Sequence, residues 1–251
     1  MSQSSMAKRK SGGILETVKT IIYAVVIAVG IRTVAFEPFN IPSGSMVPTL
    51  LVGDYLFVSK FSYGYSRYSL PSFMEIPFSG RIFGALPHRG DVAVFRLPRD
   101  TSIDYIKRII GLPGDHIQVK TGQLYINGKE VPRTLATNDF VDSSGSAPVI
   151  KREYAEALPG GTTHMILKTT DDGWANNTPE FDVPTDHVFA MGDNRDDSQD
   201  SRFDAVGYVP VENLVGRAEI IFFSIDATSP WWEVWEWPFE IRWSRLFTVI
   251  H

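Results

Sequence analysis

Residues 105–111 read YIKRIIG, and this stretch decides how the middle of the chain folds. β-Branched and aromatic side chains make up most of it, which favours a strand. Because side chains alternate between the two faces of a strand, Tyr105, Lys107 and Ile109 share one face. A lysine with such apolar neighbours is unusual, since lysine is normally a surface residue. The stretch therefore predicts either a half-exposed strand or a buried lysine that the protein uses.

Short segments of similar composition lie on both sides of this strand. Glycine, proline, asparagine and aspartate residues separate them, and Asn127-Gly128 is the tip of a predicted hairpin. Many short strands with frequent turns predict a mainly β fold of antiparallel sheets or a partly closed barrel. Residues 134–148 are small and polar and are predicted to be an exposed excursion. The predicted strands are 54–60, 91–96, 102–110, 116–120, 123–126 and 219–224.

The N-terminal part of the chain has a different character. Residues 14–36 are mostly apolar, and residues 20–31 carry no formal charge. The segment is long enough to cross a bilayer, which takes roughly 20 residues. Glu16, Lys19 and Arg32 lie near its ends, where such side chains can reach the interface. We therefore expect one N-terminal transmembrane helix that anchors the protein.

Basic residues indicate the orientation of this anchor. Lys8, Arg9 and Lys10 precede it, and only Arg32 follows closely. By the positive-inside rule, residues 1–13 are a basic cytoplasmic N-terminus and the rest of the chain lies outside. The alternative is a cleavable secretory signal peptide, which also combines a basic start with an apolar core. Cleavage would leave the serine motif described below almost at a new N-terminus.

Composition excludes several classes of protein. The chain has 251 residues, of which 43% are hydrophobic and 21% charged, as in an ordered globular protein. A net charge of -5 gives no reason to expect nucleic-acid binding. There are no cysteines, which excludes disulfides, a thiol nucleophile and thiolate metal sites.

A second motif, PSGSM at 42–46, places a serine in a glycine-containing turn. Serine needs a base to take its proton, and a lysine can serve only when it is neutral. The ordinary lysine pKa of about 10.4 must then be lowered by burial, which the apolar strand around Lys107 would supply. Ser45 and Lys107 are therefore candidates for a nucleophile and its base. No histidine offers a better base, because none lies in an HExxH pattern or in a recognisable pairing with an acidic residue.

A third motif, GDNRDDSQDSR at 192–202, is rich in aspartate. Counted from Asp193, its spacing departs from that of a calcium loop. Position six is Ser198 in place of glycine, and position twelve is Asp204 in place of glutamate. We therefore predict no metal site here and interpret Asp200 as a partner of a nearby arginine.

The three motifs, in this order and behind an apolar segment, resemble those of the bacterial type I signal peptidases, also called leader peptidases. The resemblance runs from about Ile14 to about Phe223, with an unmatched stretch at 62–86. It implies a membrane-anchored serine endopeptidase, without a cofactor, that cleaves N-terminal signal peptides from exported preproteins after a small-x-small (Ala-x-Ala) site. It also implies a place in the bacterial inner (plasma) membrane, a periplasmic or extracytoplasmic catalytic domain, and proximity to the translocation machinery. The best-known members of the family carry two membrane segments, whereas this chain shows one candidate, so we expect a single pass.

The resemblance implies roles for the residues at matching positions. Ser45 matches the nucleophile and Lys107 the general base. Ser43 matches a side-chain donor to the oxyanion, beside the backbone N–H of Ser45. Ser198 matches a serine that hydrogen-bonds the lysine amine and orients it. Residues that match the pockets for small side chains are Ile41, Met46, Leu50 and Ile106, for which plain core packing is the alternative. Residues that match structural ion pairs are Asp200 with Arg195 or Arg202.

This interpretation places an extracytoplasmic β catalytic domain at 37–225, with an insertion at about 62–86, and a separate C-terminal segment at 226–251. Five of the six tryptophans fall within 231–243. Because tryptophan favours the membrane–water interface, the C-terminal segment is predicted to lie there, or else to pack on the β domain or mediate self-association.

Two other functions remain open at this stage. One is a related Ser/Lys hydrolase, such as a self-cleaving repressor or a peptidase dedicated to one pilus or conjugation substrate. A repressor would carry a DNA-binding region where this chain has an apolar segment. The other is a non-enzymatic, membrane-anchored β domain that binds partners or lipid through its tryptophan-rich tail, for which Ser45 and Lys107 would be dispensable.

Overall fold

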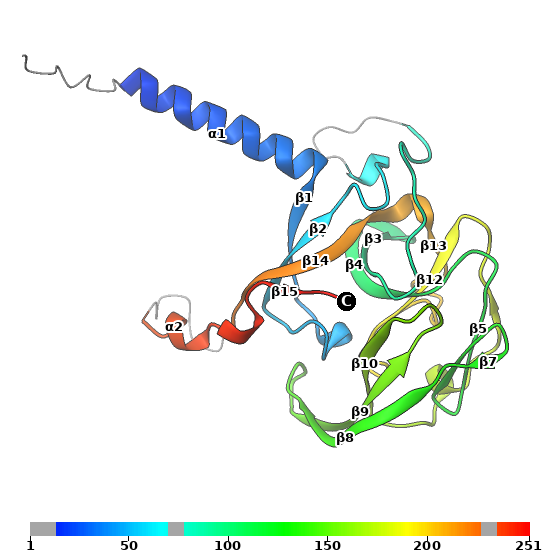
Figure 1. Ribbon diagram of the computed structural model, residues 1–251. Helices are drawn as coiled ribbons and strands as arrows, with labels where there is room; N and C mark the ends of the chain where they lie inside the picture. The colour runs from blue at the N-terminus through cyan, green and yellow to red at the C-terminus, as the bar shows by residue number, and fades with distance from the viewer. Residues whose placement is uncertain (1–13, 70–77, 227–234) are drawn as a thin grey trace, which may run out of the picture.

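The computed structural model describes residues 14–69, 78–226 and 235–251, which form a β domain with one long helix projecting from it (Figure 1). The strands are β1 (Phe36–Asn40), β2 (Asp54–Ser59), β3 (Val92–Leu97), β4 (Asp100–Gly111), β5 (His116–Lys120), β6 (Gln123–Ile126), β7 (Lys129–Glu130), β8 (Arg133–Asp142), β9 (Val149–Ala157), β10 (Thr163–Lys168), β11 (Phe181–Asp182), β12 (His187–Met191), β13 (Val209–Pro210), β14 (Leu214–Ser224) and β15 (Thr248–Val249). The helices are α1 (Ile14–Val34) and α2 (Trp237–Glu240), and the 3-10 turns are η1 (Gly44–Met46), η2 (Arg67–Ser69), η3 (Trp174–Asn176), η4 (Val211–Asn213) and η5 (Trp243–Arg245).

The largest sheet contains the lysine strand, β4. Its order is β1-β2-β14-β3-β4-β12-β13, with β15 added to β14. Every pairing between the named strands is antiparallel, which confirms the predicted antiparallel sheets. The path ends at β1 and at β13, so the sheet does not close into a barrel. Two smaller sheets, β10-β9-β8 and β11-β5-β6-β7, complete the domain.

An apolar cluster behind the serine turn holds that turn in place. Ile41, Met46 and Leu50, which flank Ser45, pack in one cluster with side chains of the large sheet such as Leu56. Met46 and Leu50 have no exposed surface. Burying an apolar side chain of this size contributes about 1.5–3 kcal/mol to stability. The position of the turn is therefore a consequence of core packing.

Residues 134–148, predicted to be an exposed excursion, are strand as far as Asp142. β8 pairs with β9 to form a long hairpin whose tip lies between Asp142 and Val149. Residues 134–136 are consecutive and all exposed, so this part of the ribbon has solvent on both faces. The predicted exposure is confirmed, since most of residues 134–148 are exposed. The strand was not predicted, because polar residues on a strand that is exposed on both faces resemble loop residues.

The helix α1 stands away from the β domain (Figure 1). Large apolar side chains described from Val18 to Val34 are exposed, with Ile21, Tyr23 and Ile27 at 57%, 64% and 61%. The end of the helix is tied to the domain by Tyr65, whose hydroxyl donates to the carbonyl of Val34 at 2.6 Å. Within the described parts of the chain, no helix combines the length and the apolar character that crossing a membrane requires.

The expected insertion at 62–86 extends over residues 70–77, which lie outside the described ranges. Its second part is held by the guanidinium of Arg81, which spans two segments of the β domain. Because each donor of this guanidinium meets a backbone carbonyl, Arg81 fastens the insertion to the start of β14. The carbonyls that accept its hydrogen bonds are those of Tyr63, Gly64, Val211, Glu212 and Leu214.

In the described residues, arginine attaches the C-terminal segment to the domain. Residues 227–234, which include two of the tryptophans, lie outside the described ranges. Trp235 and Trp243 are each 63% exposed, so these two rings do not pack into the core. Arg245 donates from Nε at 3.0 Å to the carboxylate of Asp54, which is fully buried. Beyond it, β15 pairs with β14.

Candidate active site

The serine turn and the strand β4 bring Ser45 and Lys107 together. Lys107 Nζ lies 2.7 Å from Ser45 Oγ and 3.0 Å from the backbone carbonyl oxygen of Ile106. Ser45 is 8% exposed and Lys107 only 4%. The ring of Tyr105 lies beside the amine, with its centroid 5.2 Å from Nζ. Two side chains separated by 62 positions in the sequence thus share one poorly solvated site.

Burial changes the acidity of this lysine. Loss of solvation lowers the pKa of Lys107 from 10.5 to about 8, although the carboxylates of Asp200 and Asp193 act in the opposite direction. Each of these carboxylates is paired with an arginine, which limits its attraction for the ammonium ion. At a pH equal to this pKa, half of the lysine side chains are neutral and able to accept a proton from Ser45.

Two buried arginine–carboxylate pairs flank the dyad. Arg202 donates from Nε and Nη2 to the two oxygens of Asp200, both at 2.8 Å. Arg108, the neighbour of Lys107 in β4, donates from Nε at 2.9 Å and Nη2 at 2.8 Å to the two oxygens of Asp193. All four residues are at most 1% exposed. The pair of Asp200 with Arg202 was one of the two predicted alternatives. The pair of Asp193 with Arg108 was not predicted, although both residues lie inside the sequence motifs.

Arg195 has a different partner from the one considered. Its guanidinium binds both carboxylate oxygens of Glu156 in β9, with 2.8 Å between Nη1 and Oε1. Asp200 therefore pairs with Arg202 and not with Arg195. Glu156 is fully buried, which its sequence does not indicate, because a glutamate in a polar strand is normally exposed. The pair fastens the loop at 192–202 to the three-stranded sheet.

Ser43 and Ser198 both lie near the dyad but in different surroundings. Ser43 is exposed, and its Oγ is 3.5 Å from Ser45 Oγ. Ser198 is 5% exposed and packs so closely on Gly192 that a Cβ there would lie 2.2 Å from Ser198 Oγ. The Ser198 hydroxyl is near the Asp200 carboxylate, but it makes no hydrogen bond of normal geometry with any described residue. The hydrogen bond to the lysine amine that the resemblance implies is absent, since Lys107 Nζ is directed to Ser45 and to a backbone carbonyl.

The four residues expected to form substrate pockets lie together, but three of them belong to the core. Ile41, Met46 and Leu50 are at most 3% exposed and form part of the cluster behind the turn. Ile106 is partly buried and packs against that cluster. A side chain without exposed surface cannot contact a substrate. This excludes Met46 and Leu50, which are 0% exposed, and leaves Ile106 as the most exposed of the four, with Ile41 at 3%.

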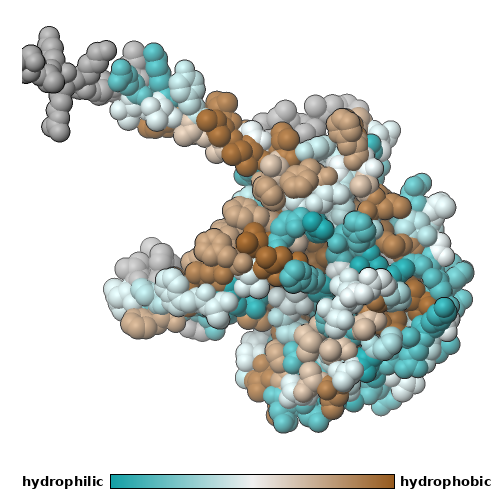
Figure 2. Space-filling model, in the orientation of Figure 1, coloured by the Kyte–Doolittle hydropathy of each residue, from teal (hydrophilic) through white to brown (hydrophobic). Residues whose placement is uncertain are grey.

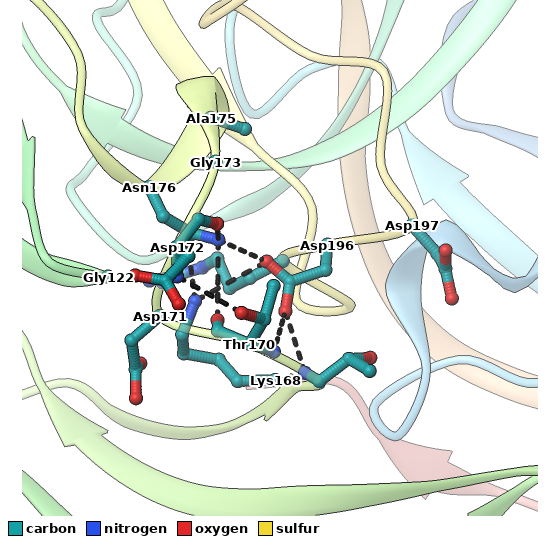
Figure 3. Close-up of polar contacts among 12 residues, drawn as sticks. Gly122, Lys168, Thr170, Asp171, Asp172, Gly173, Ala175, Asn176, Asp196 and Asp197 are labelled. Atoms are coloured by element: carbon teal, nitrogen blue, oxygen red, sulfur yellow. Dashed lines mark hydrogen bonds and ion pairs between the residues drawn. The ribbon is translucent and has the colours of Figure 1, made fainter.

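Lysines hold the acidic side chains in the middle of the loop. Figure 3 shows the carboxylate of Asp196 facing Asn176 and Lys168, whereas Asp197 points away from this cluster. Lys168 Nζ donates to Asn176 Oδ1 at 2.6 Å and lies 3.4 Å from Asp196 Oδ1. Asp197 is bound instead by Lys151 Nζ. Neighbouring carboxylates of the loop thus neutralise buried lysines from two different strands.

One group among the described residues has the side-chain types that a metal ion needs. It consists of His116, Glu180 and Asp182, all exposed. His116 Nδ1 is already bound to Asp182 Oδ1 at 2.6 Å. None of the three contacts Ser45 or Lys107, so we interpret the group as a surface ion pair.

Known proteins share both the motifs and most of the length of this chain. A family model described as "Signal peptidase, peptidase S26" matches residues 14–223. Signal peptidase I of Rickettsia canadensis (strain McKiel) is 44% identical over 223 residues, which cover 86% of this chain and 81% of the relative. Signal peptidase I of Rickettsia typhi (strain ATCC VR-144 / Wilmington) is 41% identical over 248 residues, which cover 91% of each. A crystal structure of a signal peptidase I from Enterococcus faecalis V583 aligns at 25% identity with a TM-score of 0.32, covering 53% of this chain and 97% of that one.

Proposed function

Because this chain belongs to the signal peptidase family, peptidase S26, we propose that it cleaves signal peptides with Ser45 as nucleophile and Lys107 as general base. Preproteins that carry signal peptides are then its substrates. The observation that carries the proposal is the 2.7 Å contact between Lys107 Nζ and Ser45 Oγ in a site where both side chains are buried. The lowered pKa of Lys107 provides a neutral amine at mildly alkaline pH.

In the acylation step, neutral Lys107 accepts the proton of Ser45 Oγ while that oxygen bonds to the scissile carbonyl carbon. The oxyanion that forms accepts hydrogen bonds from the backbone N–H of Ser45 and from the hydroxyl of Ser43. Protonated Lys107 then donates its proton to the amide nitrogen, the C–N bond breaks, and the mature protein leaves with a free amino terminus. The signal peptide remains attached to Ser45 as an ester.

In the deacylation step, neutral Lys107 accepts a proton from a water molecule as that water attacks the ester carbonyl. The same two donors stabilise the second oxyanion. The ester bond breaks, Ser45 Oγ takes the proton back from Lys107, and the signal peptide leaves with a carboxyl terminus. Lys107 is neutral again at the end, so the cycle consumes one water and needs no cofactor.

Substrate selection follows from the shape of a bound peptide. If the preprotein binds as an added strand, the residues one and three positions before the cut point to the same side. Ile106 and the apolar cluster of Ile41, Met46 and Leu50 lie next to the dyad on the enzyme. Because the core behind Ile106 is filled, large substrate side chains would be excluded there. We therefore expect cleavage after a small-x-small sequence.

The same proposal includes anchoring of the chain to the bacterial plasma membrane through α1, with its N-terminus in the cytoplasm and the β domain outside. The exposed apolar side chains of α1 support it, and Figure 2 shows hydrophobic residues around the root of this helix. Aromatic rings near that root continue the apolar surface, since Phe36 contacts Phe57 and Phe57 stacks on Phe222 at 4.3 Å. A contiguous exposed apolar surface of this kind is typical of a membrane interaction site. A site held there would meet preproteins as they emerge from the translocation machinery.

The dyad is tested by cleavage of a secretory preprotein with an Ala-x-Ala site by the detergent-solubilised full chain, with products identified by mass. Ser45→Ala and Lys107→Met are compared with the wild type and with Lys168→Met. The last variant is a matched control, because it also removes a buried lysine but makes no contact with the dyad. We expect cleavage at the site by the wild type and the control only.

Cleavage that survives Ser45→Ala or Lys107→Met would refute the dyad. If the wild type leaves Ala-x-Ala substrates intact but cuts one other protein, the enzyme is a peptidase dedicated to that substrate. Flotation with phospholipid vesicles checks the anchor separately, since the full chain should float and a chain that begins at residue 35 should not.

A further inference from the structure

We propose that Asn194, held by Asp142 and Lys151 of the β8–β9 hairpin, is a positioning residue that aims the backbone N–H of Ser45 at the oxyanion. The inference rests on the proposed function, because it assigns that N–H as an oxyanion donor. It gives a role to two hairpin residues that lie outside all three sequence motifs.

Asn194 holds the backbone on both sides of the nucleophile. Its side-chain Nδ2 donates to the carbonyl oxygen of Gly44 at 3.0 Å, and its backbone N–H donates to the carbonyl oxygen of Ser45 at 3.1 Å. The carbonyl of Gly44 and the N–H of Ser45 belong to one planar trans peptide group and point in opposite directions. A hydrogen bond that fixes the Gly44 carbonyl therefore also fixes the direction of the Ser45 N–H.

The amide of Asn194 is itself held in one orientation. Its Oδ1 accepts from Lys151 Nζ at 2.8 Å, and its Nδ2 also donates to Asp142 Oδ2 at 2.8 Å. A reversed amide would place NH₂ against the ammonium ion and its oxygen against the carboxylate, so the two charges select the observed orientation. Lys151 and Asp142 are in turn 2.8 Å apart. The exposed fractions of Asn194, Asp142 and Lys151 are 0%, 4% and 2%.

The hairpin brings Asp142 and Lys151 to the serine turn. Asp142 ends β8 and Lys151 lies in β9, opposite Phe140. The tip that joins the two strands touches the turn directly, since a Cβ on Gly44 would lie 2.0 Å from Ser144 Oγ. Figure 1 shows the closed end of the hairpin reaching the segment between β1 and β2.

Asp142 stays ionised in these surroundings. Burial alone would raise the pKa of Asp142, but hydrogen bonds from Lys151, Ser144 and Asn194 lower it to about 2. The carboxylate therefore keeps its charge throughout the pH range in which the neutral lysine of the dyad operates. The orientation of the Asn194 amide consequently does not change with pH in that range.

A second cluster of the same composition provides a comparison within the same molecule (Figure 3). Lys168, Asn176 and Asp196 also combine a buried lysine with an asparagine and an aspartate. The Nδ2 of Asn176, however, donates to the carbonyls of Thr170 and Asp172 and not to the serine turn. Removal of Lys168 therefore imposes a similar loss of a buried charge without touching Gly44.

The experiment compares Lys151→Met with Lys168→Met in the detergent-solubilised full chain, using the Ala-x-Ala preprotein. For Lys151→Met we expect kcat to fall by about 10- to 100-fold, less than the 10²–10³-fold typical for loss of a whole oxyanion donor, because the N–H is misdirected rather than removed. KM and the midpoint of the pH–rate profile should stay unchanged, since neither substrate binding nor Lys107 is altered. Lys168→Met should keep the wild-type kcat.

A peptide aldehyde with a small-x-small sequence supplies a readout that a general loss of stability would not move. Its adduct with Ser45 places an oxyanion in the hole, so Lys151→Met should weaken its inhibition by the same factor as kcat. If Lys151→Met fails to fold, Asp142→Asn serves instead, because it keeps the shape of the side chain and removes only the charge that orients the amide.

The possible results distinguish a failure of the role proposed for Asn194 from a failure of the Ser45/Lys107 dyad. A folded Lys151→Met or Asp142→Asn enzyme with the wild-type kcat overturns it. A fall in kcat with a displaced pH midpoint and an unchanged aldehyde affinity also overturns it, because the hairpin would then act through Lys107. If the Ser45→Ala variant still cleaves the preprotein at the wild-type rate, the proposed dyad itself is wrong.

Discussion

Replacing Lys107 with methionine should remove activity and yet make the folded chain more stable at neutral pH. The pKa of Lys107 falls from 10.5 to about 8 because the side chain is buried. Since one pKa unit corresponds to about 1.4 kcal/mol, keeping the ammonium ion inside the protein costs about 3 kcal/mol. Methionine fills a similar volume without charge. It also removes the hydrogen bond from Lys107 to the carbonyl of Ile106, and this loss offsets about 1 kcal/mol of the gain in stability. The expected net gain at pH 7 is about 2 kcal/mol.

The sign of the pH dependence follows from the same two pKa values. Between pH 8 and 10.5 the unfolded wild type binds more protons than the folded one, so its free energy of unfolding rises with pH in this window. The Lys107→Met variant lacks this contribution. Its advantage should therefore shrink by about 2 to 3 kcal/mol between pH 7 and pH 10, leaving it equal to or slightly less stable than the wild type.

Urea unfolding followed by tryptophan fluorescence in detergent measures this difference at each pH. Lys129→Met, which removes an exposed lysine from the edge of the four-stranded sheet, is the control and should match the wild type throughout. The wild-type kcat/KM, measured on the same samples, should fall about tenfold for each pH unit below 8. A stability difference between Lys107→Met and wild type that stays constant from pH 7 to 10 would refute the argument that burial lowers the pKa of this lysine.

Two further variants test the surroundings of the dyad. Ser43→Ala should lower kcat on the Ala-x-Ala preprotein by about 10²–10³-fold with little change in KM, because it removes one oxyanion donor. An unchanged kcat would exclude Ser43 from that role. Asp193→Asn leaves the guanidinium of Arg108 buried without a charged partner and should lower the free energy of unfolding by about 3–5 kcal/mol in urea titrations. A loss below about 1 kcal/mol, the range of exposed pairs, would show that the pair is solvated.

The arrangement around Lys107 balances opposing electrostatic effects. Two carboxylates near the amine would by themselves favour its charged form, and each is neutralised by a bidentate arginine. Because the arginine–aspartate pairs carry little net charge, desolvation decides the protonation of the lysine. The pairs therefore have an effect besides holding the loop in place. They allow two aspartates to lie near Lys107 without restoring its pKa to the ordinary value.

The sequence alone determined the class of fold and the chemistry that was expected, because both are written in local patterns. Alternating β-branched residues around Lys107 and the glycine-containing turn around Ser45 each carry their signal within a few positions. The antiparallel sheets and the family were predicted from such segments. The proximity of Ser45 and Lys107 was inferred because a serine nucleophile requires a base and because both residues match the dyad of the family.

Tertiary structure alone decided which charges meet. Arg195 binds Glu156 rather than Asp200, and the amide of Asn194 is shared between Asp142 and Lys151. These partners lie on strands that are distant in sequence. The sequence does not distinguish a charged residue that is exposed from one that is buried in an ion pair. The open path of the large sheet was likewise undetermined, because strand composition does not specify which edges pair. Only the packing of the whole chain brings those strands together, and with them the charges that surround the site.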